Sequence, residues 1–450
     1  MVTIWYALAA LLTVAWILRW YVVEHYRRKE RLLTESAYDG PPDPAPPVSI
    51  LVAGKDEEDN IEVCVRSLLA QDYPDFDVIA VNDRSGDATP SILDRLAKEF
   101  PDRLKVIHVR HLPDGWFGKH HAMHVGVQAA RGDWLLFTDA DCRQVSRRTL
   151  SLSMRESIER KVDFLSLLPV LDNRRFWECW FQPVCAAILL LWFQPRKVNK
   201  PQSPHAYANG AFMLMNRRCY DAIGGHPAFR QQANEDIHMA RVAKSQGLRL
   251  KVMQNDGLYV THMYRTFKEA WRGWGRIFYG CLGQRRKIAL AMMFLLFFSI
   301  TPWASLIAAL AGAALAEGAN RAAWREAALV WTGVVLIMQF ALVSWYRIVR
   351  TPVIWSLGYA LGSLVAWTSL LHAFFQVGGR ARTVWRGTIY RAGVRTDQAP
   401  DSTPSEGLRG SAPVIAEAAG YGAPPAAPGT VPVSPIALPS QAAESVRLEG

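Results

Sequence analysis

The chain is poor in cysteine and in charge. Only six of its 450 residues are cysteine, and they form neither a CxxC pair nor a regular spacing. A zinc ribbon and a disulfide scaffold are therefore not indicated, and a catalytic region facing a reducing cytosol fits best. Charged residues make up 20% of the sequence and hydrophobic residues 50%, which excludes a chain that is disordered throughout.

Two common phosphate-binding loops are also missing. No GxGxxG follows an apolar strand-like run, and no GxxxxGK[ST] occurs. The glycine-rich loops that bind phosphate in dinucleotide-binding and P-loop proteins are therefore missing. The net charge is +11, and basic clusters border the apolar runs. Basic residues in such positions attract anionic lipid headgroups. Since no nucleic-acid-binding motif is present, we expect no nucleic acid partner.

The first long apolar run predicts a membrane anchor over residues 1–24. Ile4–Val23 is apolar except for Arg19, which lies close enough to one end to reach the interface. A signal peptide is the alternative, but the chain starts with uncharged residues and no small-residue cleavage site follows. The basic run Arg27–Arg31 places this end of the anchor in the cytoplasm.

A transmembrane region of about three helices is expected over residues 284–378. Three uncharged runs there are each long enough to cross a bilayer: Ile288–Leu315, Ala327–Tyr346 and Val353–Val377. Three crossings from a cytoplasmic start would leave the basic cluster Arg380, Arg382 and Arg386 outside. Either one run is re-entrant, or the first run turns back near Pro302, and both alternatives stay open.

Composition divides the rest of the chain. Residues 25–47 form a basic juxtamembrane segment and a Pro-rich linker, and residues 48–283 form a soluble-looking domain. Residues 379–396 are a basic segment, and residues 397–450 have the composition of a disordered tail. Within the domain, Phe176–Gln194 is strongly apolar, and we expect either a segment dipping into the membrane interface or a buried core helix.

Strand and helix patterns alternate in the first half of the domain. We expect strands at Val48–Gly54, Phe76–Val81, Leu104–Val109 and Trp134–Thr138, with helices at Glu57–Ala70, Asp87–Phe100 and Lys119–Arg131 between them. This succession predicts an α/β fold with a mostly parallel sheet flanked by helices. Ligands of such sheets bind beyond the carboxyl ends of the strands.

Acidic residues follow three of these strands. They are Asp56 and Glu57 after the first strand, Asp83 after the second, and Asp139 and Asp141 after the fourth. One such pair is commonly a helix cap, but three clusters at one sheet edge favour a ligand site. The Asp-x-Asp carboxylates are hard oxygen ligands suited to Mg²⁺ or Mn²⁺ together with a diphosphate. Further on, Glu235-Asp236 opens a helical pattern, where a cap is again the alternative.

These motifs together resemble a known family. VSILVAGKDEEDNI, VNDRSGDAT, the DAD triplet, ANGAFMLMNR and NED are similar, in order and spacing, to the inverting family-2 glycosyltransferases with a GT-A (Rossmann-like) fold, over roughly Val48–Gly283. The segment GWFGKHHAMHVG (Gly115–Gly126) resembles the membrane-bound subgroup that acts on carotenoid-, hopanoid- and ceramide-type lipids.

The resemblance implies a role for each matching residue. Asp83 would accept a hydrogen bond from the uracil of a UDP-linked donor, and Asp56 and Glu57 would line the nucleoside pocket. Asp139 and Asp141 would address the ribose and the metal-bound diphosphate, and Lys119 would neutralise the diphosphate at a helix start. Asp236, beside Glu235 in the same catalytic motif, would be the general base.

Two further positions keep alternative readings. His262 is either an additional metal ligand or a histidine satisfied at a strand end. The stretch Trp271–Arg276 either closes over the donor phosphates through Arg276 or forms an interfacial helix.

The sequence thus predicts a multi-pass membrane protein with a cytoplasmic catalytic domain. We expect a metal-dependent, inverting glycosyltransferase that moves a sugar from a UDP-linked nucleotide sugar to a lipid hydroxyl. A processive polysaccharide synthase is one alternative, but its Q-x-x-R-W signature is missing. A non-catalytic sugar-nucleotide-binding membrane protein is the other, although every acidic motif is intact.

Overall fold

A computed structural model describes residues 2–29, 32–232 and 234–377, and the backbone of three short strands beyond them. Those strands are β11 (Arg382–Trp385), β12 (Thr388–Arg391) and β13 (Val394–Arg395), within the segment expected to be basic. The expected disordered tail, 397–450, lies outside the described residues, as do Arg31, Arg380 and Arg386 of the basic clusters.

A seven-stranded sheet forms the centre of the domain, in the order β3-β2-β1-β4-β8-β6-β9. All neighbouring strands run parallel except β8, which is antiparallel to both β4 and β6. The predicted mostly parallel sheet flanked by helices is therefore confirmed. Its strands are β1 (Val48–Gly54), β2 (Phe76–Asp83), β3 (Leu104–Val109), β4 (Trp134–Asp139), β6 (Phe164–Leu168), β8 (Phe212–Asn216) and β9 (Leu250–Gln254).

Helices cover both faces of this sheet. Along β1, Ile50 and Val52 pack into one apolar core while Leu51 packs into the other, because successive strand side chains point to opposite faces. The helices are α2 (Ile61–Leu69), α3 (Thr89–Glu99), α4 (Gly118–Gln128), α5 (Thr149–Glu159), α8 (Arg217–Ala222), α9 (Gly225–Ala228) and α10 (Glu235–Ser245). Helix α2 starts later than predicted, because the backbone N–H of Glu57 is held in a loop by Thr89 Oγ1, 2.9 Å away.

A second, three-stranded sheet connects the Asp139–Asp141 loop to a distant part of the chain. Strand β10 (Tyr259–Thr261) lies between β5 (Cys142–Gln144) and β7 (Val170–Leu171). Directly after it, the backbone N–H of His262 donates to the carbonyl oxygen of Asp141 over 3.2 Å. The sequence pattern did not predict this sheet.

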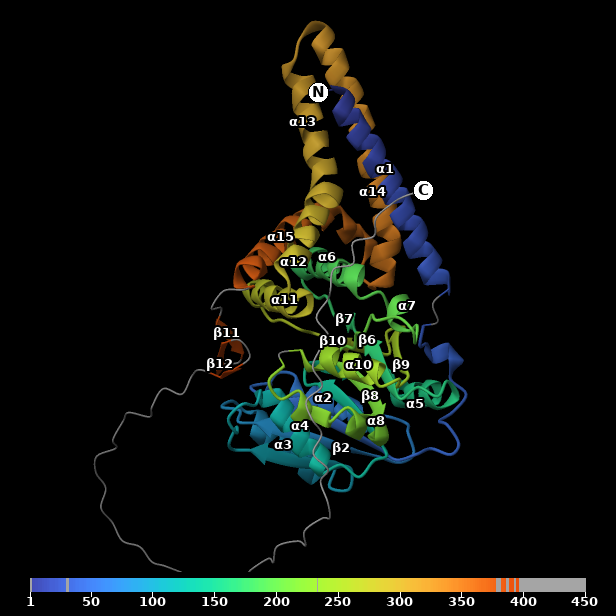
Figure 1. Cartoon of the computed structure of the whole chain (residues 1–450), viewed down its shortest axis with the longest axis vertical. Helices are drawn as coiled ribbons and strands as arrows, with labels where there is room; N and C mark the ends of the chain where they lie inside the picture. Colours follow the sequence, from blue (N-terminus) through green and yellow to red (C-terminus); the bar gives the residue numbers. More distant parts are fainter. Residues whose placement is uncertain are drawn as a thin grey trace, which may run out of the picture. The chain divides into compact units, whose positions relative to one another are not determined.

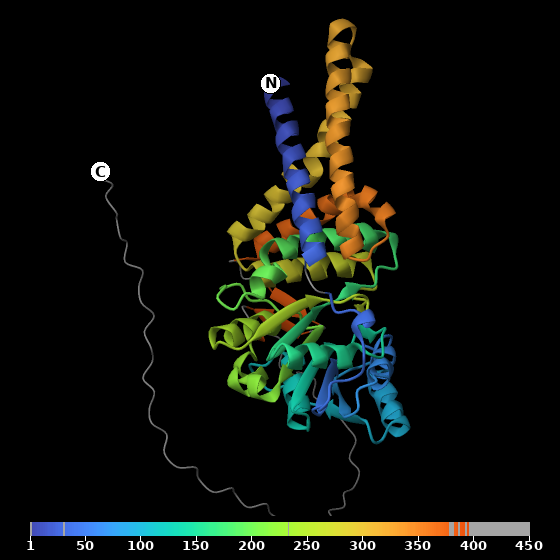
Figure 2. The same cartoon turned by 90° about the vertical axis from the view of Figure 1, so that its right-hand side faces the viewer.

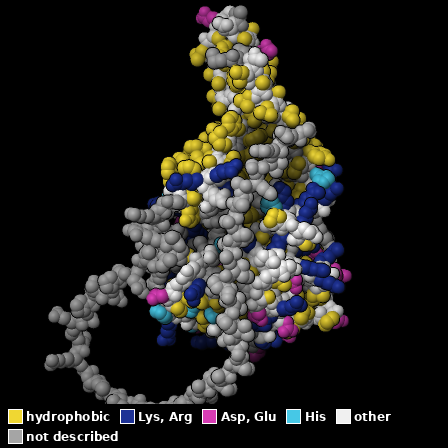
Figure 3. Space-filling view, in the orientation of Figure 1, with side chains coloured by type: hydrophobic (Ala, Val, Ile, Leu, Met, Phe, Trp, Pro, Cys, Tyr) yellow, Lys and Arg dark blue, Asp and Glu magenta, His cyan; other side chains and the backbone are white. Residues whose placement is uncertain are grey.

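Long apolar helices project away from the domain. Figures 1 and 2 show α1 (Val2–Lys29), α13 (Thr301–Leu315) and α14 (Gly318–Ile348) extending on one side of it. Hydrophobic side chains cover this projecting part, and Lys and Arg side chains gather near its base (Figure 3). In the described residues, five helices are long and apolar enough to cross a membrane, by length and composition alone.

A layer of shorter helices lies between the projecting helices and the sheet (Figure 1). It contains α6 (Phe176–Trp192), α11 (Phe267–Leu282), α12 (Arg285–Phe294) and α15 (Tyr359–Gln376), with the small helix α7 (Pro195–Val198) beside it. Side-chain hydrogen bonds join these helices: the indole of Trp271 donates to Thr368 over 2.9 Å, and Trp345 donates to the carbonyl oxygen of Pro183 over 3.1 Å.

The late apolar runs therefore differ in their placement. Helices α12 and α13 are continuous through a π-helical segment, η2 (Leu295–Ile300), so the alternative of a turn-back near Pro302 is wrong. Helix α15, preceded by the short helix η3 (Val353–Gly358), packs against α6, α11 and α12. This position favours the re-entrant alternative for Val353–Val377.

Helix α6 matches the buried-helix alternative over most of its length. Within the apolar segment Phe176–Val198, which contains α6, 56% of the most apolar stretch is buried in the protein, and Phe181 and Val184 are fully buried. Phe176, at its start, remains 61% exposed. The Pro-rich linker also packs on the domain, where Leu33 pairs with the end of β9 and the short helix η1 (Glu35–Ala37) follows.

Candidate active site

Two loops at the carboxyl ends of β1 and β2 are joined by reciprocal hydrogen bonds. Asp56 Oδ1 accepts from the backbone N–H of Gly86 over 2.8 Å, and Ser85 Oγ accepts from the backbone N–H of Asp56 over 3.0 Å. Asn60 donates to Glu57 over 2.9 Å. Three of the expected nucleoside-pocket residues, Asp56, Glu57 and Asp83, therefore lie at one sheet edge.

The buried carboxylate of Asp83 is held in a fixed orientation. The Arg84 guanidinium donates to both of its oxygens, over 2.8 and 3.0 Å. The first residue of α4, Gly118, approaches so closely that a Cβ there would overlap Asp83 Oδ2. Glycine at this position allows the N-terminus of α4 to lie against the carboxylate, where the helix dipole favours negative charge.

Lys119 links two acidic elements that are far apart in the sequence. Its Nζ lies 2.7 Å from Asp139 Oδ1 at the end of β4 and 3.1 Å from Glu235 Oε1 at the start of α10. Burial acts to lower the pKa of Lys119, but Asp139 and Glu235 outweigh it and raise this pKa well above its ordinary value. The lysine therefore stays charged at neutral pH.

Glu235 is an ion-paired carboxylate. Its second oxygen lies 3.0 Å from His120 Nε2. Burial would raise its pKa, but Lys119 and His120 hold the pKa of Glu235 well below the ordinary value. Glu235 is therefore a poor proton acceptor, and it acts on its neighbour Asp236 as a fixed negative charge.

Asp236 has the opposite electrostatic environment. Burial raises its pKa to about 7, and the charge of Glu235 adds to this rise while Lys119 opposes it. One carboxylate oxygen accepts from the backbone N–H of Gly210 over 3.0 Å and the other from Ile237 over 2.8 Å. A carboxylate held rigidly with a pKa near neutrality is suited to accept a proton at physiological pH.

Gly210 lies at the meeting point of these groups. A Cβ on Gly210 would lie 3.2 Å from Lys119 Nζ and 3.5 Å from Asp236 Oδ2. A side chain here would occupy the space in front of both groups. Gly210 belongs to the sequence Asn209–Phe212, whose glycine predicts a close approach of the backbone, and the structure places that backbone against Asp236.

Asp141 and His262 are brought together by the second sheet. Burial raises the pKa of Asp141 to about 7, and the carboxylates of Asp139 and Glu57 add to the rise. His262 Nδ1 donates a hydrogen bond to the carbonyl oxygen of Asp172 over 3.1 Å.

These residues fit a divalent cation chemically. Carboxylates that raise one another's pKa are stabilised by a cation between them, and hard oxygen ligands suit Mg²⁺ and Mn²⁺. Within the described part of the chain, however, no three His, Cys, Asp or Glu side chains are gathered closely enough to form a metal-binding group. The metal-ligand roles of Asp139, Asp141 and His262 remain predictions.

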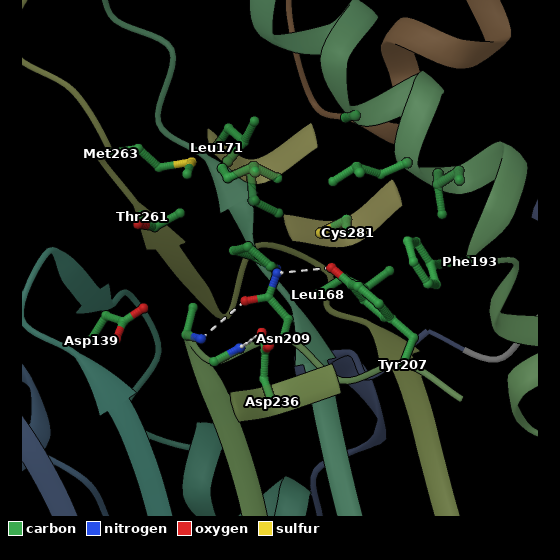
Figure 4. A pocket seen from close by; sticks show the side chains of 18 of the residues that line it. Asp139, Leu168, Leu171, Phe193, Tyr207, Asn209, Asp236, Thr261, Met263 and Cys281 are labelled. Atoms are coloured by element: carbon green, nitrogen blue, oxygen red, sulfur yellow. Dashed lines mark hydrogen bonds between the residues drawn. The ribbon is translucent and has the colours of Figure 1, made fainter. Parts of the chain in front are cut away.

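A cavity of about 300 Å³ joins the acidic cluster to the helical layer. Lys119, Asp139, Asp141, Glu235 and Asp236 line its polar end, and Arg276 of α11 lines it as well. The remaining wall is largely apolar, with side chains from α6, α11 and the end of α14. Figure 4 shows Asp139 and Asp236 below Leu171, Met263 and Cys281.

The sequence motifs did not mark Tyr207 as a cavity residue. Tyr207 and Asn209, which precede β8, line the cavity together with the acidic residues. The motif ANGAFMLMNR pointed to this region, but it did not distinguish the tyrosine. The apolar wall could not be identified from the sequence, because the apolar residues of α6 and α14 are equally typical of a protein core and of a membrane segment.

An α/β sheet with titratable residues in a cavity at its carboxyl edge is typical of enzymes that bind nucleotide ligands. Residues 49–224 match the family model described as glycosyl transferase family 2. The family predicted from the sequence motifs is confirmed.

Individual relatives are distant. The 4,4'-diaponeurosporenoate glycosyltransferase of Staphylococcus aureus (strain USA300) is 26% identical over 257 residues, which cover 56% of this chain and 66% of that protein, just under two thirds of its length. Among solved structures, mannosyltransferase PcManGT from Pyrobaculum calidifontis, in complex with GDP-Man and Mn²⁺, is 22% identical with a TM-score of 0.47. That alignment covers 80% of this chain and 98% of the mannosyltransferase chain.

Proposed function

We propose that this protein is a membrane-bound, inverting glycosyltransferase that moves a sugar from a nucleotide sugar, UDP-linked, to a lipid hydroxyl. One observation carries the proposal: Asp236, with a pKa of about 7, lies where the Lys119–Asp139 ion pair meets the apolar cavity. Such a junction suits a base that serves a polar donor and an apolar acceptor together.

Asp236 would act as the general base. It would take the proton of the acceptor hydroxyl while that oxygen attacks the anomeric carbon of the sugar. The bond between this carbon and the diphosphate oxygen breaks, and the nucleoside diphosphate leaves from the opposite side, which inverts the configuration. No covalent sugar–enzyme bond is needed, and a positioned base contributes about 10²–10⁴ in rate.

The donor would lie along the carboxyl edge of the sheet. Asp56, Glu57 and Asp83 would hold the nucleoside, with Asp83 accepting from the base. Lys119 and the N-terminus of α4 would meet the diphosphate, because both favour negative charge. Arg276 lines the same cavity and would add a second cation at the phosphates.

A divalent cation would be held by Asp139 and Asp141, with His262 as a candidate third ligand. When bound, Mg²⁺ or Mn²⁺ stabilises the negative charge that develops on the leaving diphosphate. The mannosyltransferase PcManGT has Mn²⁺ with its GDP-Man, and the same ion class suits these oxygen ligands.

The proposed acceptor is a membrane lipid. The cavity opens from the acidic cluster toward α6, α11 and α14, which belong to the apolar helical part of the chain. The relative from S. aureus is named for 4,4'-diaponeurosporenoate, a long apolar carboxylate, so its name supports an apolar acceptor but not the hydroxyl. A glycolipid product fits both observations.

We further propose that α1, α12–α13 and α14 cross the membrane while α15 lies along its cytoplasmic surface. The N-terminus would lie outside, and α1 would cross to the cytoplasm, where Arg27, Arg28 and the catalytic domain follow. Helices α12–α13 would cross outward and α14 back, which leaves Arg347 and Arg350 on the cytoplasmic side. The predicted last basic segment would lie on that side too.

The test uses membranes that contain the full chain. They are incubated with a panel of labelled sugar nucleotides, and the extracted lipids are analysed for labelled product. We expect label in lipid for one donor class with wild type, and a loss of about 10²–10⁴ in Asp236→Asn.

Asp221→Asn is the matched control, because Asp221 is an exposed aspartate on α8 outside the cavity. It should keep wild-type transfer. Equal turnover in Asp236→Asn and wild type would contradict the base assignment, and long polymeric products would favour the polysaccharide synthase instead.

A further inference from the structure

The cavity contains a polar group that the reaction chemistry does not use. Tyr207 is only 8% exposed, and its ring stacks on Phe193 at the end of α6 with ring centroids 4.9 Å apart. Its hydroxyl accepts a long hydrogen bond of 3.4 Å from Asn209 Nδ2. Among the described residues, the Tyr207 hydroxyl donates no hydrogen bond.

The orientation of the Asn209 amide determines the direction of this contact. Asn209 Oδ1 accepts from the backbone N–H of Ala211 over 3.0 Å, so its Nδ2 must be the donor toward Tyr207. Ser166, which is fully buried, accepts from the backbone N–H of Asn209 over 2.8 Å. The tyrosine oxygen is therefore an acceptor toward Asn209, and its own hydrogen remains for a ligand in the cavity.

Tyr207 and the proposed base, Asp236, line the same cavity. Figure 4 shows the Asn209 side chain between Tyr207 and Asp236. The backbone of the next residue, Gly210, donates to Asp236 over 3.0 Å. One short segment of chain, residues 207–210, therefore carries the tyrosine hydroxyl and also holds the proposed proton acceptor through a backbone hydrogen bond.

The wall above this pair is apolar and belongs to the membrane-associated helices. Leu190 lies on α6, and Phe193 directly follows this helix. The end of α14 contributes Trp345 and Ile348, with Val349 directly after it. An apolar chain that extends from the pair would contact these apolar side chains.

The charge of the polar end restricts the terminal group of such a chain. The cavity is lined by four carboxylates, Asp139, Asp141, Glu235 and Asp236, against the two cations Lys119 and Arg276. Lys119 is already ion-paired with Asp139 and Glu235. A second anion would lie beside the donor diphosphate, which repels it, and would lack a free counter-charge from Lys119.

Resting on the function proposed above, we propose that the cavity binds the end of an apolar lipid chain that carries an uncharged hydroxyl. Tyr207 donates its hydrogen bond to the oxygen of this hydroxyl while Asp236 takes its proton. As the oxygen loses this proton it attacks the anomeric carbon, and the bond from that carbon to the diphosphate oxygen breaks, so that the nucleoside diphosphate leaves. Tyr207 positions the acceptor oxygen, and the charge of the polar end disfavours a carboxylate- or phosphate-terminated lipid.

The experiment compares three probes with the same chain: hexadecan-1-ol, hexadecanoic acid and hexadecyl phosphate, each in neutral phospholipid vesicles with the full-length protein. Two readouts are taken with the active sugar nucleotide, namely transfer to the probe and hydrolysis of the donor by water. We expect wild type to glycosylate the alcohol at least about tenfold better than either anion, because like charges repel in the cavity.

Tyr207→Phe keeps the ring on Phe193 and removes only the hydroxyl. We expect it to raise the KM for the alcohol about five- to tenfold, since one hydrogen bond is lost, and to leave the donor KM and the hydrolysis rate unchanged. Tyr73→Phe is the matched control, because the buried Tyr73 donates to the carbonyl of Pro46 over 2.7 Å, outside the cavity lining. It should leave the alcohol KM unchanged.

A second variant tests the apolar wall independently. Ile348→Trp fills space at the end of α14, so transfer to hexadecan-1-ol should fall while transfer to octan-1-ol and donor hydrolysis persist. An unchanged alcohol KM in Tyr207→Phe, or a preference for either anionic probe, would overturn the assignment of the cavity. If wild type neither transfers nor hydrolyses any nucleotide sugar, the proposed function itself fails.

Discussion

Lys119 Nζ lies 2.7 Å from Asp139 Oδ1, and this ion pair joins the start of α4 to the end of β4. The two residues come from different strand–helix units of the sheet. The ion pair keeps the amine of Lys119 protonated at the polar end of the cavity, next to the proposed base.

Lys119→Met removes this charge. We expect the donor KM to rise about ten- to a hundredfold, the range for losing a hydrogen bond to a charged group. Because Lys119 also lowers the pKa of Asp236, the acidic limb of the pH–rate profile should move to higher pH. Donor titrations at several pH values measure both effects. Lys98→Met, at an exposed position on α3, should change neither, and an unmoved pH profile in Lys119→Met would contradict the coupling.

The rate of transfer should depend on pH through Asp236. Its pKa is raised to about 7, so the proton-accepting form is lost below this value and kcat/KM should fall about tenfold per pH unit. Above pH 7 the profile should level off. A rate that stays constant between about pH 5 and 7 would exclude Asp236 as the base.

The same pKa shift affects stability with the opposite sign. Asp236 binds its proton more tightly in the folded state than at its ordinary pKa of 3.8, so its contribution to the free energy of unfolding is largest at low pH and falls as pH rises toward 7. The thermal midpoint of Asp236→Asn should decline less over this range than that of wild type.

Removal of divalent cations should weaken donor binding. Asp141 has a pKa of about 7 raised by burial and by neighbouring carboxylates, and a bound cation would favour its ionised form. We expect UDP to raise the thermal midpoint in Mn²⁺ but much less in chelator, and less at pH 6 than at pH 8. In Asp141→Asn, UDP should raise the thermal midpoint only slightly, both in Mn²⁺ and in chelator. A wild type indifferent to chelator would remove the metal assignment.

Gly118→Ala should disturb the nucleoside pocket. A Cβ at this position overlaps the Asp83 carboxylate, which must then move away from its place beside Arg84. We expect the donor KM to increase by about tenfold or more, as in the loss of a fixed charged hydrogen bond. Gly86→Ala is the control in the neighbouring loop, because nothing lies within 4 Å of the Cβ it would add. Equal donor KM values in the two variants would contradict the role of Asp83.

Gly362→Ala should weaken the packing of α15 on α6. Its Cβ would overlap the backbone carbonyl of Trp180, which cannot move aside as a flexible side chain can. We expect a loss of about 1–3 kcal/mol in stability, typical of overpacking. Gly333→Ala, in α14, has nothing within 4 Å of its new Cβ and should be neutral or stabilising. Thermal unfolding in detergent measures both, and equal midpoints would contradict the close contact of α15 with α6.

The sheet was largely predictable because its signal is local. Val48–Gly54 is a continuous apolar run that becomes β1 with the predicted bounds, and Leu104–Val109 likewise becomes β3. The acidic residues that follow strands share an edge as a consequence of parallel strand direction. Strand β8 was not assigned, because antiparallel pairing between β4 and β6 depends on partners distant in the sequence.

The site was predictable in its acidic residues but not in its surroundings. Asp83, Asp139 and Asp236 carry recognisable motifs, whereas nothing near Tyr207 in the sequence marks it as a cavity residue. Its position depends on Phe193 and on the Asn209 amide, and those contacts form only when α6 and β8 are in place.

The sequence by itself determined the α/β alternation, the order of the acidic motifs and the presence of long apolar runs, because periodicity and strand-end chemistry are properties of neighbouring residues. Tertiary structure alone decided that Lys119 joins Asp139 to Glu235, that Asp236 has a pKa of about 7, and that α15 packs beside α6. Burial and pairwise charge depend on distances between segments far apart along the chain, and only the folded structure sets those distances.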